Sequence, residues 1–234
     1  MKRIIKISLI LLLVGMAVIA AVPFFKEKRA ERKYENEFKK IQESVTEKKS
    51  DVNGLVKKNK DCIGYVEIQG TTISYPVMQT KDNPDFYLNH DFNRNYSFYG
   101  TPYLSAYCDV EKSDNLIIYG HNINGGKMFG ALEQYKDKEF FYKHRKIYFT
   151  TDKKREYEVF AVMSVNIHEF EYWKFVMARD EKEYDEFVDK VEEHSLWRQG
   201  NKPKYGEQML MLSTCDNGKW DDWRIVLIAK CVYS

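Results

Sequence analysis

The stretch from Gln208 to Lys230, QMLMLSTCDNGKWDDWRIVLIAK, contains two apolar runs joined by a short polar segment. Each run has the length and the Leu, Ile, Val and Met content of a buried β-strand. The segment between them has the Asn, Gly and Asp residues of a turn or loop. Because the first run ends on Cys215 and the second begins with Arg224, the stretch predicts two strands with a thiol and a guanidinium at one end.

Working outward from this stretch, the same strand pattern recurs along most of the chain. About eight short β-branched or aromatic runs are separated by Gly, Pro, Asn and Asp. Such a series favours a closed barrel or a sandwich over a doubly wound sheet, and the chain is long enough to bury a core. The runs are CIGYVEI (62–68), TTISYPVM (71–78), TPYLSA (101–106), NLIIYG (115–120), KIYFTT (146–151), EYEVFAVMSV (156–165), QMLMLST (208–214) and RIVLIAKCV (224–232).

Helical segments are expected between some of these strands. Residues 127–135 and 138–144 are short candidates, whereas 179–197 is a long charged segment with one apolar stripe. The members of that stripe are Tyr184, Phe187, Val188, Val191 and Leu196. Residues 26–60 have the spacing of an amphipathic helical lead-in, which Asn53-Gly54 is expected to divide into two helices.

The N-terminus predicts a membrane anchor. An uncharged apolar run from Ile7 to Phe25 follows three basic residues, and its 19 residues are about enough to cross a bilayer. Basic residues at the short end favour a cytoplasmic N-terminus with the remainder outside. The expected organisation is therefore an anchor at 1–25, the helical lead-in at 26–60 and the β-rich domain at 61–234 outside the membrane, with single-pass localisation in the cell membrane.

Composition excludes several classes of function. The formal net charge is only +2 with 31% charged residues, so we expect no nucleic-acid partner. The four cysteines have no zinc-type spacing with one another or with histidine, and no carboxylate cluster suggests a calcium site. Neither a metal nor another cofactor is expected.

Three residues stand where strands end or begin. Cys215 and His121 each follow an apolar strand, and Arg224 opens another. A thiolate is a nucleophile, an imidazole can exchange a proton with it, and a guanidinium can bind a developing oxyanion. If the strands are neighbours, the three residues describe acyl transfer through a thioester. His90 is the competing candidate for the histidine that exchanges a proton with the thiol.

A cysteine in an apolar strand is most often a small core residue with no catalytic function. We assign Cys62, Cys108 and Cys231 to that role. Asp216 follows Cys215 directly, but adjacent residues of an extended chain point in opposite directions. We therefore expect no Cys-His-Asp triad that includes Asp216.

These segments also carry a family likeness. LSTC (212–215) followed by RIVLIAK (224–230) resembles the TLxTC…R signature of sortases, although Met211 stands where that family usually has threonine. IIYGHNI (117–123) resembles the segment with the sortase histidine. Residues 64–92 and YGTPYLS (99–105), with the long helix at 179–197, are similar to class B sortases in particular.

The resemblance implies a mainly β fold with added helices: a closed eight-stranded sortase-type barrel with N-terminal helices and a long helix before the cysteine strand. It implies Cys215 as nucleophile, His121 as general acid and base, and Arg224 as oxyanion or substrate clamp, with Ser213 and Thr214 lining the substrate groove. The implied activity is a cysteine transpeptidase that cuts a C-terminal sorting signal, often NPQTN-like, after threonine. The cleaved substrate protein would then be transferred to a cell-wall amine of peptidoglycan.

Two other functions stay open at this point. A surface cysteine peptidase would use the same residues with water as the acceptor. A non-catalytic surface binding module would have no need of Cys215. The loop from Asp216 to Trp223, with two tryptophans and three aspartates, is expected to carry substrate selectivity.

Overall fold

The computed structural model describes residues 52–233 and, before them, residues 6, 15, 16, 19, 21–26, 28, 29, 32, 33, 35, 36, 39 and 40. The chain divides into two compact units, Met1–Glu47 and Lys48–Ser234. The described residues of the first unit are all helical. Most of the predicted anchor at 7–25 lies outside the described residues. Within the described part of the chain, no helix combines the length and the apolar character needed to cross a membrane.

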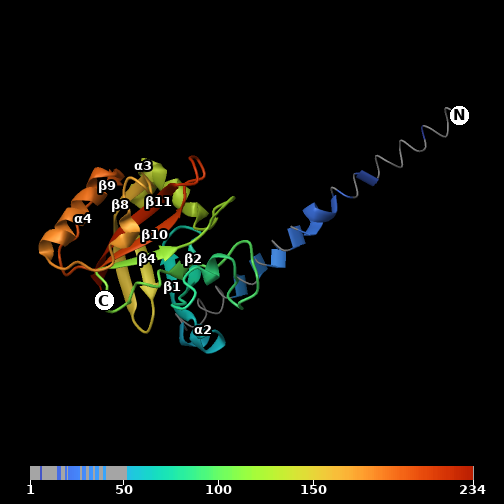
Figure 1. The fold of residues 1–234 in the computed structure, drawn as a ribbon, viewed down its shortest axis with the longest axis horizontal. Coiled ribbons are helices and arrows are strands. Elements are labelled where there is room, and N and C mark those ends of the chain that lie inside the picture. The colour runs from blue at the N-terminus through green and yellow to red at the C-terminus, as the bar shows by residue number, and fades with distance from the viewer. Residues whose placement is uncertain are drawn as a thin grey trace. The chain divides into compact units, whose positions relative to one another are not determined.

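The second unit is built around a closed barrel of eight strands (Figure 1). The strand order is β11-β10-β4-β3-β2-β1-β7-β8, and a pairing between β8 and β11 closes the ring. The bounds are β1 Cys62–Ile68, β2 Ser74–Met78, β3 Tyr103–Leu104, β4 Asn115–Tyr119, β7 Lys146–Thr150, β8 Lys154–Asn166, β10 Met209–Cys215 and β11 Trp223–Tyr233. Each strand overlaps one of the predicted runs, so the predicted mainly β, eight-stranded fold is confirmed.

The length of β8 explains how the ring closes. One edge pairs with β7 through residues 154–158 and then with β9 (Ser195–Arg198) through residues 161–163. The other edge pairs with β11 from Glu156 to Asn166. A single 13-residue strand therefore closes the barrel and also carries β9 as an extension of the sheet.

The core of the barrel lies along β10 and β4. Six of the seven residues of β10 are buried, and Cys215 at its end is the exposed one. This strand lies between β4 and β11 and is covered on both faces, which is why its sequence is an unbroken apolar run. The exposed end of a buried strand is a fixed position for a reactive side chain.

The helices agree in part with the sequence. The long helix is α4, Glu181–Glu193, which lies beside β8 and β9 (Figure 1). Its N-cap Asp180 accepts a hydrogen bond from the Glu183 amide, and four of the predicted stripe residues are buried. Leu196 was wrongly placed in the stripe, because the chain has already entered β9 and Leu196 is exposed there. The helix α3, Lys138–Lys143, is confirmed.

Two predicted helical features are wrong in detail. Residues 127–135 contain the short strand β6, Lys127–Met128, paired with β5, Asn122–Ile123, and then the 3₁₀ helix η2, Gly130–Lys136. Asn53-Gly54 does not interrupt a helix but lies inside α2, Val52–Lys58. That helix packs against β1 through Leu55 and Val52, and this burial outweighs the low helix propensity of glycine. The remaining 3₁₀ turns are η1, Phe86–Leu88, and η3, Tyr172–Lys174.

Candidate active site

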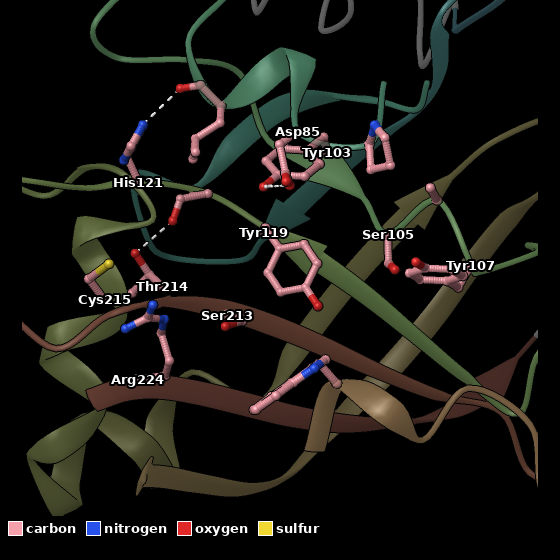
Figure 2. Close-up of a pocket in the computed structure, with 15 residues that line it drawn as sticks. Asp85, Tyr103, Ser105, Tyr107, Tyr119, His121, Ser213, Thr214, Cys215 and Arg224 are labelled. Atoms are coloured by element: carbon pink, nitrogen blue, oxygen red, sulfur yellow. Dashed lines mark hydrogen bonds between the residues drawn. The ribbon is translucent and has the colours of Figure 1, made fainter. Parts of the chain in front are cut away.

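Cys215 and Arg224 face each other across two strands. The antiparallel register of β10 and β11 makes them direct partners at the last pair of the ladder. Directly opposite residues project to the same face of a sheet, with Cβ atoms about 4.5–5.5 Å apart. Figure 2 shows the thiol and the guanidinium together at one end of a pocket. The predicted meeting of Cys215 and Arg224 at the barrel rim is confirmed.

His121 reaches the same rim from the other side of β10. The parallel register pairs Ser213 with Tyr119, and the Gly120 amide donates to the Ser213 carbonyl at 3.1 Å. Two residues further along each chain, His121 comes level with Cys215. A Cβ at position 120 would lie 2.8 Å from the Phe129 ring, so the chain approaches His121 through a position that only glycine fits.

The ring of His121 is held in a defined orientation. Its Nε2 atom lies 2.8 Å from the Leu88 carbonyl oxygen, and the ring is parallel to that of Phe98 at 6.5 Å between centroids. A carbonyl oxygen only accepts, so Nε2 carries the proton in this hydrogen bond. In the neutral ring, Nδ1 is then the basic nitrogen that can take a proton from a thiol.

Arg224 is fixed through its own backbone surroundings. Nη1 donates to the carbonyl oxygens of Asp221 at 2.5 Å and Trp223 at 3.0 Å. A guanidinium has five N–H donors, so these contacts orient the planar group and leave donors for a ligand. The guanidinium therefore places a permanent positive charge directly opposite Cys215 in the ladder.

Ser213 and Thr214 line the pocket, but both side chains are buried and already hydrogen-bonded. The Ser213 hydroxyl is 2.7 Å from that of Tyr172. The Thr214 hydroxyl donates to the Gly120 carbonyl at 2.7 Å (Figure 2). The Thr214 bond ties the strand of Cys215 to the segment of His121. Their role in binding substrate stays a prediction.

The pocket that contains these residues has a volume of about 530 Å³. Its other lining residues were not named as candidate site residues from the sequence: Pro84, Asp85, Leu88, Tyr103, Ser105, Ala106, Tyr107, Tyr119, Gly120 and Trp173. Among the described lining residues, none comes from the loop between Asp216 and Trp223. The expectation that this loop carries substrate selectivity stays a prediction. The missed residues lie on loops and on neighbouring strands. Asp85, Tyr103 and Tyr119 fall within segments that resemble sortases, but no pattern in those segments singles out these positions as pocket residues.

Tyrosine hydroxyls give the pocket much of its polar character. The Tyr103 hydroxyl donates to the Asp85 carboxylate at 3.0 Å. Burial, and then the charge of Asp85, raise the pKa of Tyr103 well above its usual range. Burial also raises the pKa of Tyr172, which lies outside the pocket lining beside Ser213, to about 12. Both hydroxyls therefore stay protonated at neutral pH and act as neutral hydrogen-bonding groups.

The competing candidates lie elsewhere. His90 stacks on Phe86 at 3.8 Å between centroids and hydrogen-bonds to its carbonyl, outside the pocket lining. Cys62 and Cys108 are buried, as expected for structural thiols, whereas Cys231 is half-buried. Of the four cysteines, Cys215 is the exposed one.

Asp216 points away from His121, as predicted. Its carboxylate accepts hydrogen bonds from Lys136 at 2.6 Å and Ser164 at 2.7 Å. Burial by itself would raise the pKa of Asp216, but the Lys136 and Ser164 hydrogen bonds and the Lys136 charge outweigh it and hold that pKa below the usual range. Asp216 is therefore an ionised structural group and not the third member of a triad.

Comparisons with known proteins identify the family to which the chain belongs. The model of the sortase domain matches residues 66–232. The chain belongs to the sortase family. Sortase B of Listeria monocytogenes is 32% identical over 80% of this chain and 76% of its own length. Sortase B of Staphylococcus aureus is 28% identical over 99% of this chain and 98% of its own.

Solved structures agree with that assignment. A Staphylococcus aureus sortase B–substrate complex superposes with a TM-score of 0.77 and 27% identity, covering 89% of this chain and 99% of that one. The resemblance to class B is therefore confirmed, and this sortase is a cysteine transpeptidase of the sortase type.

Thiol accessibility gives a direct test of the site assignment. Burial raises the pKa of Cys62 to about 12 and that of Cys108 to about 11, so both thiols stay protonated at about pH 8. A raised pKa means less thiolate at any given pH, and burial also excludes the reagent. We expect iodoacetamide to alkylate Cys215 at least about 10-fold faster than either buried cysteine, as followed by peptide mapping.

Labelling of the same protein in concentrated guanidinium chloride is the control, because unfolding should bring the three rates close together. Equal rates in the native protein would show that Cys215 is not distinguished by its position.

Proposed function

We propose that this sortase cuts the C-terminal sorting signal of secreted proteins after a threonine, holds the protein as a thioester on Cys215 and transfers it to a cell-wall amine of peptidoglycan. The observation that carries the proposal is the double pairing of β10, which puts Cys215 opposite Arg224 and level with His121. These three side chains share one pocket wall, where nucleophile, base and oxyanion donor can act on one carbonyl group.

In the first half of the reaction, the proton of the Cys215 thiol passes to His121 and the sulfur attacks the carbonyl carbon of the threonine. The C=O electrons form an oxyanion, which the Arg224 guanidinium stabilises. When the carbonyl re-forms, the C–N bond breaks and His121 gives its proton to the departing amine. The product is a thioester with Cys215.

In the second half, an amine attacks the thioester and His121 accepts the proton that the amine loses. The tetrahedral oxyanion again lies at Arg224, and its collapse breaks the C–S bond. The proton on His121 returns to the Cys215 sulfur, so the site ends in its starting state. The same three residues serve both half-reactions.

The pocket supports a peptide as the bound group. A volume of about 530 Å³ lies within the range of ligand sites, and its tyrosine and serine hydroxyls can hydrogen-bond an extended peptide backbone. One of the similar solved structures is a Staphylococcus aureus sortase B–substrate complex. An NPQTN-like signal is the first sequence to test.

The central experiment is mass spectrometry of the purified second unit with a panel of sorting-signal peptides, NPQTN-like sequences among them. We expect an adduct on Cys215 that has the mass of the peptide portion up to its threonine, because the thioester keeps that portion. Added oligoglycine or a diaminopimelate-type amine should then release the portion as an amide.

Cys215→Ala is the matched control, and it should form no adduct with any peptide. Hydrolysis alone with every amine would favour the surface peptidase. Peptide binding that is unchanged in Cys215→Ala, without turnover in the native protein, would favour the binding module.

Arg224→Lys tests the role of the guanidinium. Lysine keeps the charge but loses the forked, planar donors, so we expect acylation to slow about 10²-fold while the fold is retained. Arg145→Lys, at an exposed ion pair with Glu158, is the matched control and should act like the native protein. Native activity in Arg224→Lys would remove Arg224 from the mechanism. Native activity in His121→Ala would likewise remove His121 from it.

We also propose that residues 7–25 anchor the protein in the cell membrane, with the N-terminus cytoplasmic and the second unit on the outer face of a Gram-positive cell. The support is the apolar run and its basic flank. After cell fractionation, the full chain should stay in the membrane pellet at high salt, whereas a chain that starts at residue 26 should not. Release of the full chain by salt would contradict an anchor.

A further inference from the structure

A cluster of charged groups lies behind Cys215 that the proposed chemistry does not use. Lys136, on η2, places its Nζ atom 2.8 Å from the Oε2 atom of Glu133 and 2.6 Å from the Oδ1 atom of Asp216. One ammonium group therefore lies between two carboxylates. The side chain of Asp216 is 0% exposed, whereas those of Glu133 and Lys136 are each 30% exposed.

The cluster is connected to both reactive residues through one amide group. The Nδ2 atom of Asn122 donates to the Cys215 carbonyl oxygen at 2.7 Å and to the Oε1 atom of Glu133 at 2.7 Å. Asn122 directly follows His121 in the chain. The Asn122 amide thus joins the segment of the histidine to the backbone of the cysteine, and Glu133 holds that amide in place.

The same carboxylates hold the start of the loop after Cys215. The backbone N–H of Asn217 donates to Glu133 Oε1 at 3.1 Å, and the backbone N–H of Gly218 donates to Asp216 Oδ1 at 3.1 Å. Ser164, on β8, donates to the second oxygen of Asp216 at 2.7 Å. Three residues in a row after the cysteine are therefore fixed by the cluster.

The charge of Lys136 is what allows Asp216 to stay where it is. A buried carboxylate without a cation is costly, so it takes up a proton or moves toward water. Either response would break hydrogen bonds made by the residue next to Cys215. Geometry matters strongly here, because a displacement of about 1 Å between reacting groups can cost about 10²-fold in rate.

We propose that Glu133, Lys136 and Asp216 are positioning residues of this sortase, which set the Cys215 backbone against the His121–Asn122 segment. They act through Asn122 and the loop backbone. The proposal rests on the proposed roles of Cys215 and His121, and it adds a requirement for charge balance behind the nucleophile.

The test compares Lys136→Met with the double variant Lys136→Met/Asp216→Asn. The single change leaves a buried carboxylate without its cation. The double change removes the charges of Lys136 and Asp216 together. The side-chain amide oxygen of Asp216→Asn can still accept from the Gly218 backbone N–H. We expect iodoacetamide alkylation of Cys215 at about pH 7.5 to slow about 10-fold in the single variant and to return to within about 3-fold of native in the double one.

A second readout is cleavage of an NPQTN-like peptide, with rates divided by the concentration of thiol that can be titrated. We expect kcat to fall about 10²-fold in Lys136→Met with KM little changed, and to recover in the double variant. Lys202→Met is the matched control, because Lys202 pairs with Asp189 on the exposed face of α4. It should leave both readouts unchanged.

A purely structural role predicts a different result: a lower melting temperature in Lys136→Met but native alkylation rates below it. That result, or a double variant no faster than the single one, would overturn the proposal. Should Lys136→Met fail to fold, Glu133→Leu removes the acceptor of Asn122 instead and should slow alkylation about 3-fold or more, and native rates there would also overturn it. Failure of Cys215→Ala to abolish the thioester would, separately, overturn the proposed function.

Discussion

The register of β10 is the constraint on which the rest of the site depends. This strand is hydrogen-bonded in parallel to β4 on one edge and antiparallel to β11 on the other. A shift of one residue in either ladder would turn the side chains to the opposite face of the sheet. His121, Cys215 and Arg224 come from three strands or strand ends, and they meet only because both ladders are in register at the same time.

Closure of the barrel makes that register unique. β11 pairs with β8 along its other edge, and β8 in turn pairs with β7, so β11 has no free edge on which to slide. The strands β10 and β4 are buried over most of their length and β11 is buried from Ile225 to Ala229, so any slip would expose apolar residues to water. The same hydrophobic burial that stabilises the fold therefore sets the geometry of the three candidate residues.

Charges are arranged in two different ways around the cysteine. On the pocket side, Arg224 is held by backbone carbonyl groups, which orient it without neutralising it. On the far side, Lys136 is shared between two carboxylates. A cation that is to stabilise an oxyanion has to remain unneutralised, whereas a buried carboxylate needs a partner. The ion pairs of Lys136 are made with Asp216, next to Cys215 in the chain, and with Glu133, whereas the guanidinium opposite Cys215 is held by carbonyl groups alone, an arrangement that fits both requirements.

The sequence by itself determined the eight strands, the long helix and the candidate residues, because each depends on a local pattern. Apolar runs of strand length mark β4, β10 and β11. The sequence also shows that Cys215 follows the run of β10 and that Arg224 begins the run of β11. It did not predict β5, β6 and β9, since two-residue or half-exposed strands have too few apolar positions to form a pattern.

Only the tertiary structure decided which segments surround these residues. Asp85, Tyr103 and Trp173 reach the pocket through long-range packing, and the partners of Asp216 come from β8 and η2. Nothing in the local sequence encodes such contacts, because they depend on how strands far apart in the chain are brought together by closure of the barrel. The candidate reactive residues could therefore be picked out from the sequence, whereas the residues that hold them in place required the fold.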